Sequence, residues 1–426
     1  MAHSSRLVPL AARMLAATVL LMGGLSACRG AGLVPLASAV TTAQGESLYV
    51  RLDYRSPAEL QAAVAGGLDL FGAEMDQQRA FGRISAENLK RLQAQKLRLT
   101  IEPANAPGMG VRNQFDRGYR TYAQLTSELQ SLAAKHPEIM QLKSAGPSWE
   151  TTQGKADRQL WTVRITGPGD ASKRPAVAFT ANVHARELVP VELAMRLIQD
   201  LLTGYASGGE VKQLLDTRVV YVMPMANPDG HVRAEAGADW RKNTHAFDVG
   251  MGVDLNRNFP FKWGFDNGGS SDSPRSDTYQ GPAPASEPET QAIKAFLSGI
   301  PNLKIGMDYH SYSNLVMWPW GWTASPAPDA PMLETIGRKL ASFNRYKPIQ
   351  ASSLYPTCGT IRDFVYGELH VPYFTTEIGG RMDGFDPPFK RAQELIGENR
   401  AGAMYLLSIA DNPAQVLQTT TKRRAR

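Results

Sequence analysis

Four apolar runs between residues 175 and 377 each end beside a polar side chain of a type that binds metals or substrates. The runs cover residues 175–181, 218–224, 303–309 and 372–376, and the polar residues that follow them are His184, Asn227, His310 and Glu377. Such runs are typical of strands that are buried on both faces, with helices between them. Sites in open α/β sheets gather at the carboxyl ends of strands. The pattern therefore predicts an α/β domain with its chemistry at one edge of the sheet, and candidate helices at 188–202, 287–297 and 331–342.

A smaller unit precedes this domain. Residues 47–54 alternate apolar and polar side chains like a strand, and Ser56-Pro57 is typical of a helix start. A second helix is expected from Ser85 and a second strand over 97–101. We therefore expect a small α+β module over residues 46–102, which we call the N-terminal module. It is expected to be a propeptide, a permanent accessory module or a pairing surface.

The remaining boundaries follow from composition. Residues 29–45 are small and polar and predict a tether, and the Pro- and Gly-containing stretch 103–113 predicts a linker. The main domain is expected over 114–411, followed by a basic tail over 412–426. Among its 426 residues the chain has two cysteines, so disulfides are not expected to stabilise the domain.

The charge of the chain argues against a nucleic-acid partner. The net charge is +6, but two arginines lie in the first 28 residues and four basic residues lie in the last five, where neither segment carries an acid. The rest of the chain holds 40 basic and 40 acidic residues. A protein that binds nucleic acid usually carries its basic excess on the folded domain. We therefore expect no nucleic-acid partner.

Residues 1–28 are typical of an export signal. Arg6 and Arg13 accompany an apolar run over residues 14–25, which is shorter than the roughly 20 residues that span a bilayer. The run ends in Leu25-Ser-Ala-Cys28, which resembles a bacterial lipobox with Cys28 as the lipidated residue. The alternatives are a secretory signal cut after Ala39 and an uncleaved anchor. We expect an exported protein of the cell envelope, in contact with a membrane only through Cys28.

His184-Ala-Arg-Glu187 places an imidazole and a carboxylate three residues apart. At the start of a helix this spacing puts both side chains on one side, within reach of one ion. His310 would complete a set of two histidines and one glutamate, which leaves a fourth position open in the way of catalytic zinc sites. His231 and His245 are interpreted as loop residues and as fallback ligands.

Eight motifs identify a resemblance to the zinc metallocarboxypeptidases of the carboxypeptidase A/B type, in the order seen in that family over about residues 115–400. They are His184-Ala-Arg-Glu187, Asn227-Pro-Asp-Gly230, Trp240-Arg-Lys-Asn243, Val253-Asp-Leu-Asn-Arg-Asn-Phe259, Ser286-Glu-Pro-Glu289, His310-Ser-Tyr312, Tyr355 and the run 363–377. The resemblance implies a mixed, mostly parallel central sheet with helices on both faces, one zinc ion per chain, and hydrolysis of the C-terminal peptide bond of peptides or proteins.

The resemblance also implies a role for individual residues. His184, Glu187 and His310 match the zinc ligands, and Asp254 matches the acid that supports the first histidine, a role that general metal-site chemistry explains. The alternative for Asp254 is a loop cap. Glu377 matches the general base that takes a proton from a zinc-bound water and passes it to the leaving amine. Without the motif it would be read as a salt-bridge partner.

The implied substrate contacts are mainly arginines. Arg241 matches the residue that stabilises the oxyanion, and its neighbour Lys242 is interpreted as solvated. Asn256 and Arg257 match the pair that grips the terminal carboxylate, for which the planar fork of arginine is suited. The remaining matches are Arg186, a further substrate-binding arginine, and Tyr355, the mobile tyrosine that closes over substrate.

Arg362 occupies the position that forms the floor of the specificity pocket in the family. A buried guanidinium favours a carboxylate, because a charged hydrogen bond contributes about 1.5–3 kcal/mol and an apolar side chain would leave the arginine unpaired. We therefore predict a preference for C-terminal Glu or Asp. The alternative is that Arg362 turns away and pairs with an acid such as Glu368.

Three functions compete. The first is a monomeric lipoprotein carboxypeptidase that trims peptides outside the cytoplasm. The second is a cell-wall peptidase of the same fold, against which the Asn256-Arg257 pair argues because it implies a free α-carboxylate on the substrate. The third is a peptide-binding module on an inactive scaffold, which the complete set of ligands, base and oxyanion arginine disfavours.

Overall fold

The computed structural model describes residues 40–42, 45–109, 115 and 118–418, which belong to one unit of the chain that begins at Ala37. The predicted export signal and Cys28 lie outside the described residues, as does most of the predicted tether. Within the described residues, no helix combines the length and the apolar character that crossing a membrane requires.

The N-terminal module folds as an antiparallel sheet in the order β1-β2-β4-β3, with β5 also paired to β2. Ser85 begins the second helix, because its Oγ accepts a hydrogen bond from the Asn88 backbone N–H at 3.2 Å. Strand β1 starts within the residues expected to form a tether, so the sheet begins earlier than the sequence indicated. The elements are β1 (Val40–Thr42), β2 (Gly45–Asp53), α1 (Pro57–Ala65), β3 (Asp69–Glu74), β4 (Arg79–Ser85), α2 (Ala86–Ala94) and β5 (Arg98–Ile101).

The main domain is built on an eight-stranded sheet in the order β12-β11-β13-β10-β8-β9-β7-β6. The four predicted strands form its centre, where β13, β10, β8 and β9 pair in parallel. Antiparallel pairing begins at β7 on one side and between β13 and β11 on the other. The strands are β6 (Met140–Pro147), β7 (Gln159–Ile165), β8 (Ala176–Ala181), β9 (Val219–Met223), β10 (Leu303–His310), β11 (Leu315–Trp318), β12 (Lys347–Gln350) and β13 (Tyr373–Glu377).

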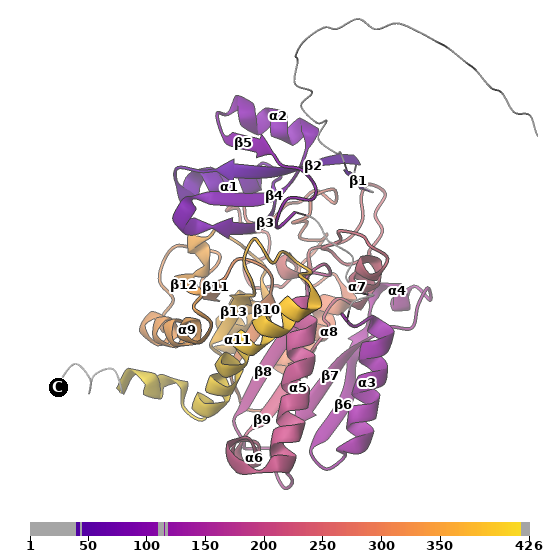
Figure 1. The fold of residues 1–426 in the computed structure, drawn as a ribbon, viewed down its shortest axis with the longest axis vertical. Helices are drawn as coiled ribbons and strands as arrows, with labels where there is room; N and C mark the ends of the chain where they lie inside the picture. The colour runs from indigo at the N-terminus through magenta and orange to yellow at the C-terminus, as the bar shows by residue number, and fades with distance from the viewer. Residues whose placement is uncertain (1–39, 43–44, 110–114, 116–117, 419–426) are drawn as a thin grey trace, which may run out of the picture. The chain divides into compact units, whose positions relative to one another are not determined.

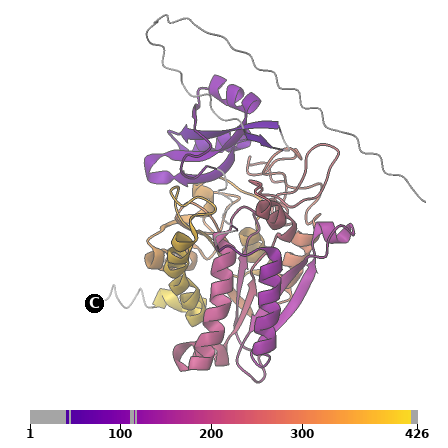
Figure 2. The ribbon, with the colours of Figure 1, turned by 45° about the vertical axis from the view of Figure 1, so that its right-hand side comes forward.

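Helices cover both faces of this sheet, which confirms the predicted fold class. Along β8, Val177 and Phe179 pack into one apolar cluster, whereas Ala176 and Ala178 pack into another on the opposite face. The first cluster includes α3 (Tyr122–Lys135), α5 (Val189–Ser207), α9 (Ala330–Asn344) and α11 (Phe389–Ile409). The second includes α8 (Pro288–Ser298) and α10 (Ile361–Leu369). Figures 1 and 2 show α3 and α5 running along the same face.

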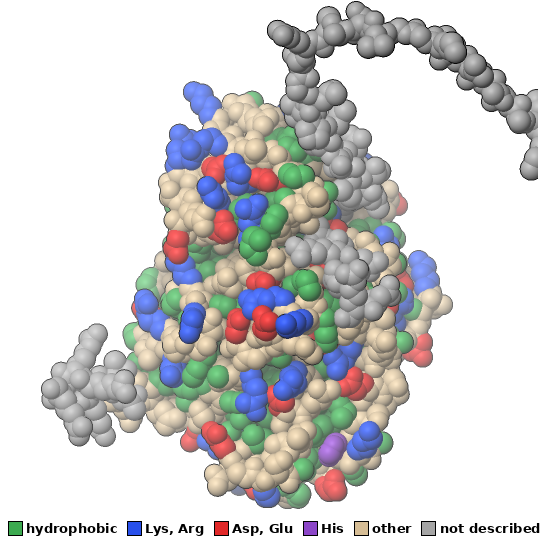
Figure 3. Space-filling view, viewed as in Figure 1, with side chains coloured by type: hydrophobic (Ala, Val, Ile, Leu, Met, Phe, Trp, Pro, Cys, Tyr) green, Lys and Arg blue, Asp and Glu red, His purple; other side chains and the backbone are tan. Residues whose placement is uncertain are grey.

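The predicted helices appear as α5, α8 and α9, each within a few residues of the expected bounds. Three shorter helices lie in the connections: α4 (Trp149–Thr152), α6 (Gly209–Thr217) and α7 (Pro228–Glu235). Asn227 caps α7 by accepting a hydrogen bond from the Gly230 backbone N–H at 3.0 Å. On the face drawn in Figure 3, acidic and basic side chains lie close to one another rather than in separate patches.

Candidate active site and metal centre

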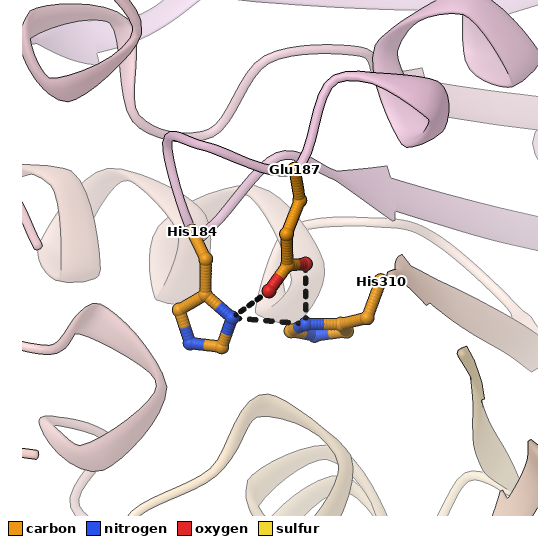
Figure 4. Close-up of side chains that lie close together, drawn as sticks. All are labelled: His184, Glu187 and His310. Carbon is orange, nitrogen blue, oxygen red and sulfur yellow. Dashed lines mark hydrogen bonds and ion pairs between the residues drawn. The ribbon is translucent and has the colours of Figure 1, made fainter. Parts of the chain in front are cut away.

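The three predicted metal ligands converge at the carboxyl ends of β8 and β10 (Figure 4). The Nδ1 atoms of His184 and His310 are 3.1 Å apart, and the two oxygens of Glu187 lie 2.7 Å from the first and 3.1 Å from the second. All three side chains are buried, and their ligand atoms lie within 4.8 Å of one another. Although burial opposes the effect, the two histidines lower the pKa of Glu187.

His184 and Glu187 lie on a turn before α5, not within the first turn of a helix as expected. The Glu187 backbone N–H donates to the His184 carbonyl at 3.2 Å, which closes the turn and points both side chains the same way. Asn182 holds this turn, because its side-chain amide donates to the carbonyls of His184 at 3.1 Å and Glu187 at 2.9 Å.

Each histidine turns its other nitrogen toward a buried carboxylate. The Nε2 atom of His184 lies 3.2 Å from Asp254, as the sequence predicted. The Nε2 atom of His310 lies 2.7 Å from Asp308, which the sequence reasoning missed. A signal was available, because Asp308 lies two residues before His310 in a predicted strand, and such residues share a face.

This set of ligand atoms fits a zinc ion. Catalytic zinc is held by three protein ligands drawn from imidazole nitrogen and carboxylate oxygen. Here the two Nδ1 atoms and the Glu187 carboxylate face one point, while the remote Nε2 atoms are bound by acids in the way that orients metal-ligating histidines. The fallback ligands lie elsewhere. His231 contacts Asn182 and the Arg120 carbonyl, and His245 binds Glu287.

Glu377 ends β13 directly beside His310 in the neighbouring strand, because the parallel register pairs these two residues. Its carboxylate lines the same cavity as both histidines. Burial raises the pKa of Glu377 to about 8, an effect that the nearby Glu187 strengthens and the nearby His310 opposes. A carboxyl group with a pKa in this range suits proton transfer near neutral pH.

Arg241 lines the cavity from the loop that follows α7. Its Nε and Nη2 atoms donate to one oxygen of Asp254 at 3.1 and 2.9 Å, while the other oxygen faces His184. Although burial opposes the effect, Arg241 and Arg257 hold the pKa of Asp254 well below its usual range. Asp254 therefore joins the cationic side of the site to the metal centre and is more than a loop cap.

Lys242, which we expected to be solvated, is 1% exposed. Its Nζ atom donates to the carbonyls of Pro274 at 2.9 Å and Ser276 at 2.8 Å. Burial lowers the pKa of Lys242 to about 8. The expectation was wrong because the loop after Trp240 is covered by residues 274–277, which are distant in sequence.

Asn256, Arg257 and Tyr355 also line the cavity. The guanidinium of Arg257 donates to the Gly269 carbonyl at 2.7 Å, to the Asn256 carbonyl at 2.8 Å and to the Tyr355 hydroxyl at 3.1 Å. The side-chain oxygen of Asn256 accepts from the Ile361 backbone N–H at 2.9 Å. These contacts fix the orientation of Asn256 and Arg257, and Arg257 supplies a positive charge to the cavity that the two histidine ligands also line.

Arg362 faces the cavity and does not turn toward Glu368. Its Nε atom donates to Asp363 at 3.2 Å, and its Nη1 atom donates to the Thr375 hydroxyl at 3.1 Å. Asp363 also accepts two backbone N–H groups, from Gly321 at 2.8 Å and Trp322 at 3.0 Å. The Asp363 carboxylate therefore holds the guanidinium of Arg362 at the cavity wall, and the same carboxylate also binds two backbone N–H groups.

Arg186 does not line the cavity with the other predicted substrate contacts, because the N-terminal module covers it. Its guanidinium is 0% exposed and donates to both oxygens of Asp69 in β3, at 2.9 and 3.0 Å. The rings of Phe71 and Phe385 lie over it, with centroids 4.4 and 4.5 Å from its central carbon. Asp239 accepts a further hydrogen bond at 3.1 Å.

The active-site cavity is small. Its volume is about 60 Å³, and three of its lining residues, Leu70, Phe71 and Gly72, come from the N-terminal module. A water molecule needs roughly 10–15 Å³ of such space. The cavity therefore has room for a few waters but not for a peptide.

Comparisons with known proteins identify the family of this chain. The family model described as zinc carboxypeptidase matches residues 125–402. A zinc carboxypeptidase of Saccharothrix mutabilis subsp. capreolus is 31% identical over 359 residues, which cover 80% of this chain and 81% of the relative. Carboxypeptidase A4 of Mus musculus is 30% identical over 283 residues, which cover 63% of this chain and 65% of the relative.

Solved structures show the same fold. The carboxypeptidase A of Helicoverpa armigera superposes with a TM-score of 0.71 at 22% identity, over 86% of this chain and 98% of that one. Thrombin activatable fibrinolysis inhibitor superposes with a TM-score of 0.68 at 21% identity, over 86% of this chain and 99% of that one. From the family match, the identity to its relatives and this fold, the chain belongs to the zinc carboxypeptidase family.

Proposed function

We propose that this protein removes the C-terminal residue of peptides, with zinc held by His184, Glu187 and His310 and with Glu377 as the general base. The observation that carries the proposal is the convergence of the three ligand side chains on one another, beside a cavity that His184 and His310 line together with Glu377. A zinc ion bound there would supply a Lewis acid and lower the pKa of a coordinated water.

Glu377 moves the proton in this proposal. It takes a proton from the attacking water and passes it to the leaving amine, which is general base and then general acid catalysis. The burial that raises the pKa of Glu377 supports the second step, because the group holds a proton readily once it has accepted one. A divalent cation nearby favours the carboxylate form at the start of the cycle.

Arg241 stabilises the oxyanion of the tetrahedral intermediate. It projects into the cavity, and Asp254 fixes its guanidinium through two hydrogen bonds, so the positive charge is in place before the reaction begins. Asn256, Arg257 and Tyr355 bind the terminal carboxylate. The contacts described for Arg257 use three of its five N–H groups, which leaves donors for a substrate.

Arg362 sets a preference for C-terminal Glu or Asp. Its position at the cavity wall supports this preference. Thr360 and Thr375 line the same cavity, and their hydroxyls suit a polar substrate side chain. Asp363 offsets part of the positive charge of Arg362. Because Asp363 also accepts backbone N–H groups, its negative charge is not neutralised by Arg362 alone. An apolar terminal side chain would bury the guanidinium without a new partner, which costs affinity.

The N-terminal module shields this site, in the manner of a propeptide. Residues 70–72 fill part of the cleft, and Asp69 occupies Arg186. The following segment is also attached, because the Tyr312 hydroxyl donates to the Gly108 carbonyl at 2.8 Å and Arg381 donates to the Pro107 carbonyl at 3.2 Å. A peptide enters only after the module has moved or has been removed.

The protein acts as a monomer that is exported to the cell envelope and anchored through a lipid on Cys28. The support for export and for the anchor comes from the first 28 residues of the sequence alone. Mass spectrometry of the mature chain tests it. A lipidated N-terminal Cys28 is the expected result, and an N-terminus after Ala39 would contradict it.

A substrate panel tests the activity. Peptides that differ only in their last residue, Glu, Lys or Phe, are incubated with the chain after limited proteolysis, with and without a zinc chelator. We expect release of the terminal residue, fastest for Glu, and no release with the chelator. Muropeptides from cell walls are digested in parallel. Cleavage of these alone would favour the cell-wall peptidase, and release that the chelator does not affect would refute the zinc mechanism.

A further inference from the structure

Asp308 lies behind the metal centre and belongs to none of the eight motifs. It is 1% exposed, and one of its oxygens lies 2.7 Å from Nε2 of His310. The two residues are separated by one position in β10, so their side chains lie on the same face of the strand. The contact therefore follows from the strand geometry and does not depend on a loop.

A second contact holds the carboxylate in place. Thr180, the partner of Asp308 in the parallel pairing of β10 with β8, donates its hydroxyl to the other oxygen of Asp308 at 2.6 Å. The Thr180 hydroxyl also lies 3.2 Å from the Tyr373 hydroxyl in β13. Three neighbouring strands at the centre of the sheet thus fix the direction in which Asp308 faces His310.

This arrangement determines which nitrogen of His310 carries the proton. At 2.7 Å the Asp308 oxygen is placed to accept a hydrogen bond from Nε2, which leaves Nδ1 as the nitrogen available to a metal. Nδ1 is the atom that faces Nδ1 of His184 and the Glu187 carboxylate. The imidazole is thereby prepared as a metal ligand, in the same way that Asp254 prepares His184 on the opposite side.

We propose that Asp308 is a positioning residue that fixes the tautomer and orientation of His310 and so strengthens zinc binding. The proposal rests on the proposed zinc site. Acids that support a metal-ligating histidine typically contribute 10–100-fold to metal affinity. Asp308 touches no part of the cavity that a substrate would reach, since it does not line it. We therefore expect a replacement of Asp308 to weaken zinc binding more than it weakens substrate binding.

The zinc affinity of the full chain, measured by competition with a chromogenic chelator, tests this. Asp308→Asn keeps the shape and removes the charge, and we expect its dissociation constant for zinc to rise about 10–100-fold. Thr180→Val loosens the carboxylate and keeps it, so we expect a smaller rise. Asp383→Asn is the matched control, because Asp383 contacts Arg391 and the Gly380 backbone and neither histidine.

The metal-free stability of each variant separates positioning from a structural role. We expect Asp308→Asn to change the free energy of unfolding, measured with chelator present, much less than it changes the affinity for zinc. Unchanged zinc affinity in that variant, or a loss of metal-free stability that accounts for the whole change, would overturn the proposal. Failure of the proposed function looks different, because the wild-type chain itself would then bind zinc weakly or not at all.

Discussion

Asp69 of the N-terminal module accepts hydrogen bonds from both terminal nitrogens of Arg186. Arg186 lies 117 positions later in the chain, between the predicted metal ligands His184 and Glu187 in the sequence. Both side chains are buried, and the surrounding charge cluster includes Arg83, Asp239 and Asp277. The contact joins β3 to the turn that carries His184 and Glu187. The cover over the site is therefore attached at the metal centre itself.

Asp69→Asn is expected to weaken this cover. Breaking a buried ion pair by removing one charge typically costs about 3–5 kcal/mol, and we expect the lower end here because Asp239 still binds Arg186. We expect the peptidase activity of the intact chain to rise at least about tenfold, since 1.4 kcal/mol of docking free energy corresponds to that factor. The measurement is kcat/KM on a Glu-terminal peptide without proteolysis.

Asp53→Asn provides the matched control for this change. Asp53 belongs to the same module but pairs with Arg51 and Arg79 within it. Its replacement should leave the activity of the intact chain unchanged. Equal activity of Asp69→Asn and the wild type would contradict a shielding role for the contact.

Glu377→Gln is expected to lower kcat by about 10²–10⁴-fold, because proton transfer by a positioned base typically contributes that factor. The amide has nearly the same shape, so zinc content and the free energy of unfolding should stay close to those of the wild type. Exposed Glu368→Gln in α10 serves as the control and should keep full activity. Substantial hydrolysis by Glu377→Gln would remove the base from the mechanism.

Arg362→Met tests specificity. We expect the ratio of kcat/KM for Glu-terminal over Leu-terminal peptides to fall by roughly tenfold to 150-fold, the equivalent of one charged hydrogen bond. The ratio is informative because it cancels any loss of active enzyme. The variant should also be less stable, since Asp363 loses its cationic partner. An unchanged ratio would show that Arg362 does not read the terminal side chain.

His231 predicts a pH dependence of stability. Burial lowers the pKa of His231 from 6.5 to about 4. The folded state therefore binds fewer protons than the unfolded state between these values, and folding loses stability as the pH falls through them. A shift of this size corresponds to about 3 kcal/mol, lost between pH 6.5 and 4 and fully present above pH 6.5.

Urea unfolding at pH 7, 5.5 and 4 measures this loss. His231→Asn removes the titrating group, so its free energy of unfolding should fall less steeply with acid than that of the wild type. His370→Asn changes an exposed histidine at the end of α10 and should follow the wild-type profile. Parallel profiles for the wild type and His231→Asn would contradict the assignment.

Much of the catalytic centre could be read from the chain because its geometry is local. Strands buried on both faces must be almost continuously apolar, so their ends are visible in the sequence, and parallel pairing brings His310 and Glu377 together. The spacing of His184 and Glu187 put both on one side, although a turn rather than a helix achieves it. The outer strands β6, β7, β11 and β12 carry no histidine or acid as their last residue and were not anticipated.

Only the tertiary structure decided how distant segments cover one another. The burial of Lys242 by residues 274–277 and the burial of Arg186 by Asp69 both depend on the packing of separate layers, which no local periodicity encodes. Asp308 lies between these cases. The sequence indicated which face of the strand Asp308 occupies. Its role became visible only from its contacts with Thr180 and His310 in the folded structure. Sequence spacing determines which side chains leave a strand together, and the packing of whole elements determines which partners they meet.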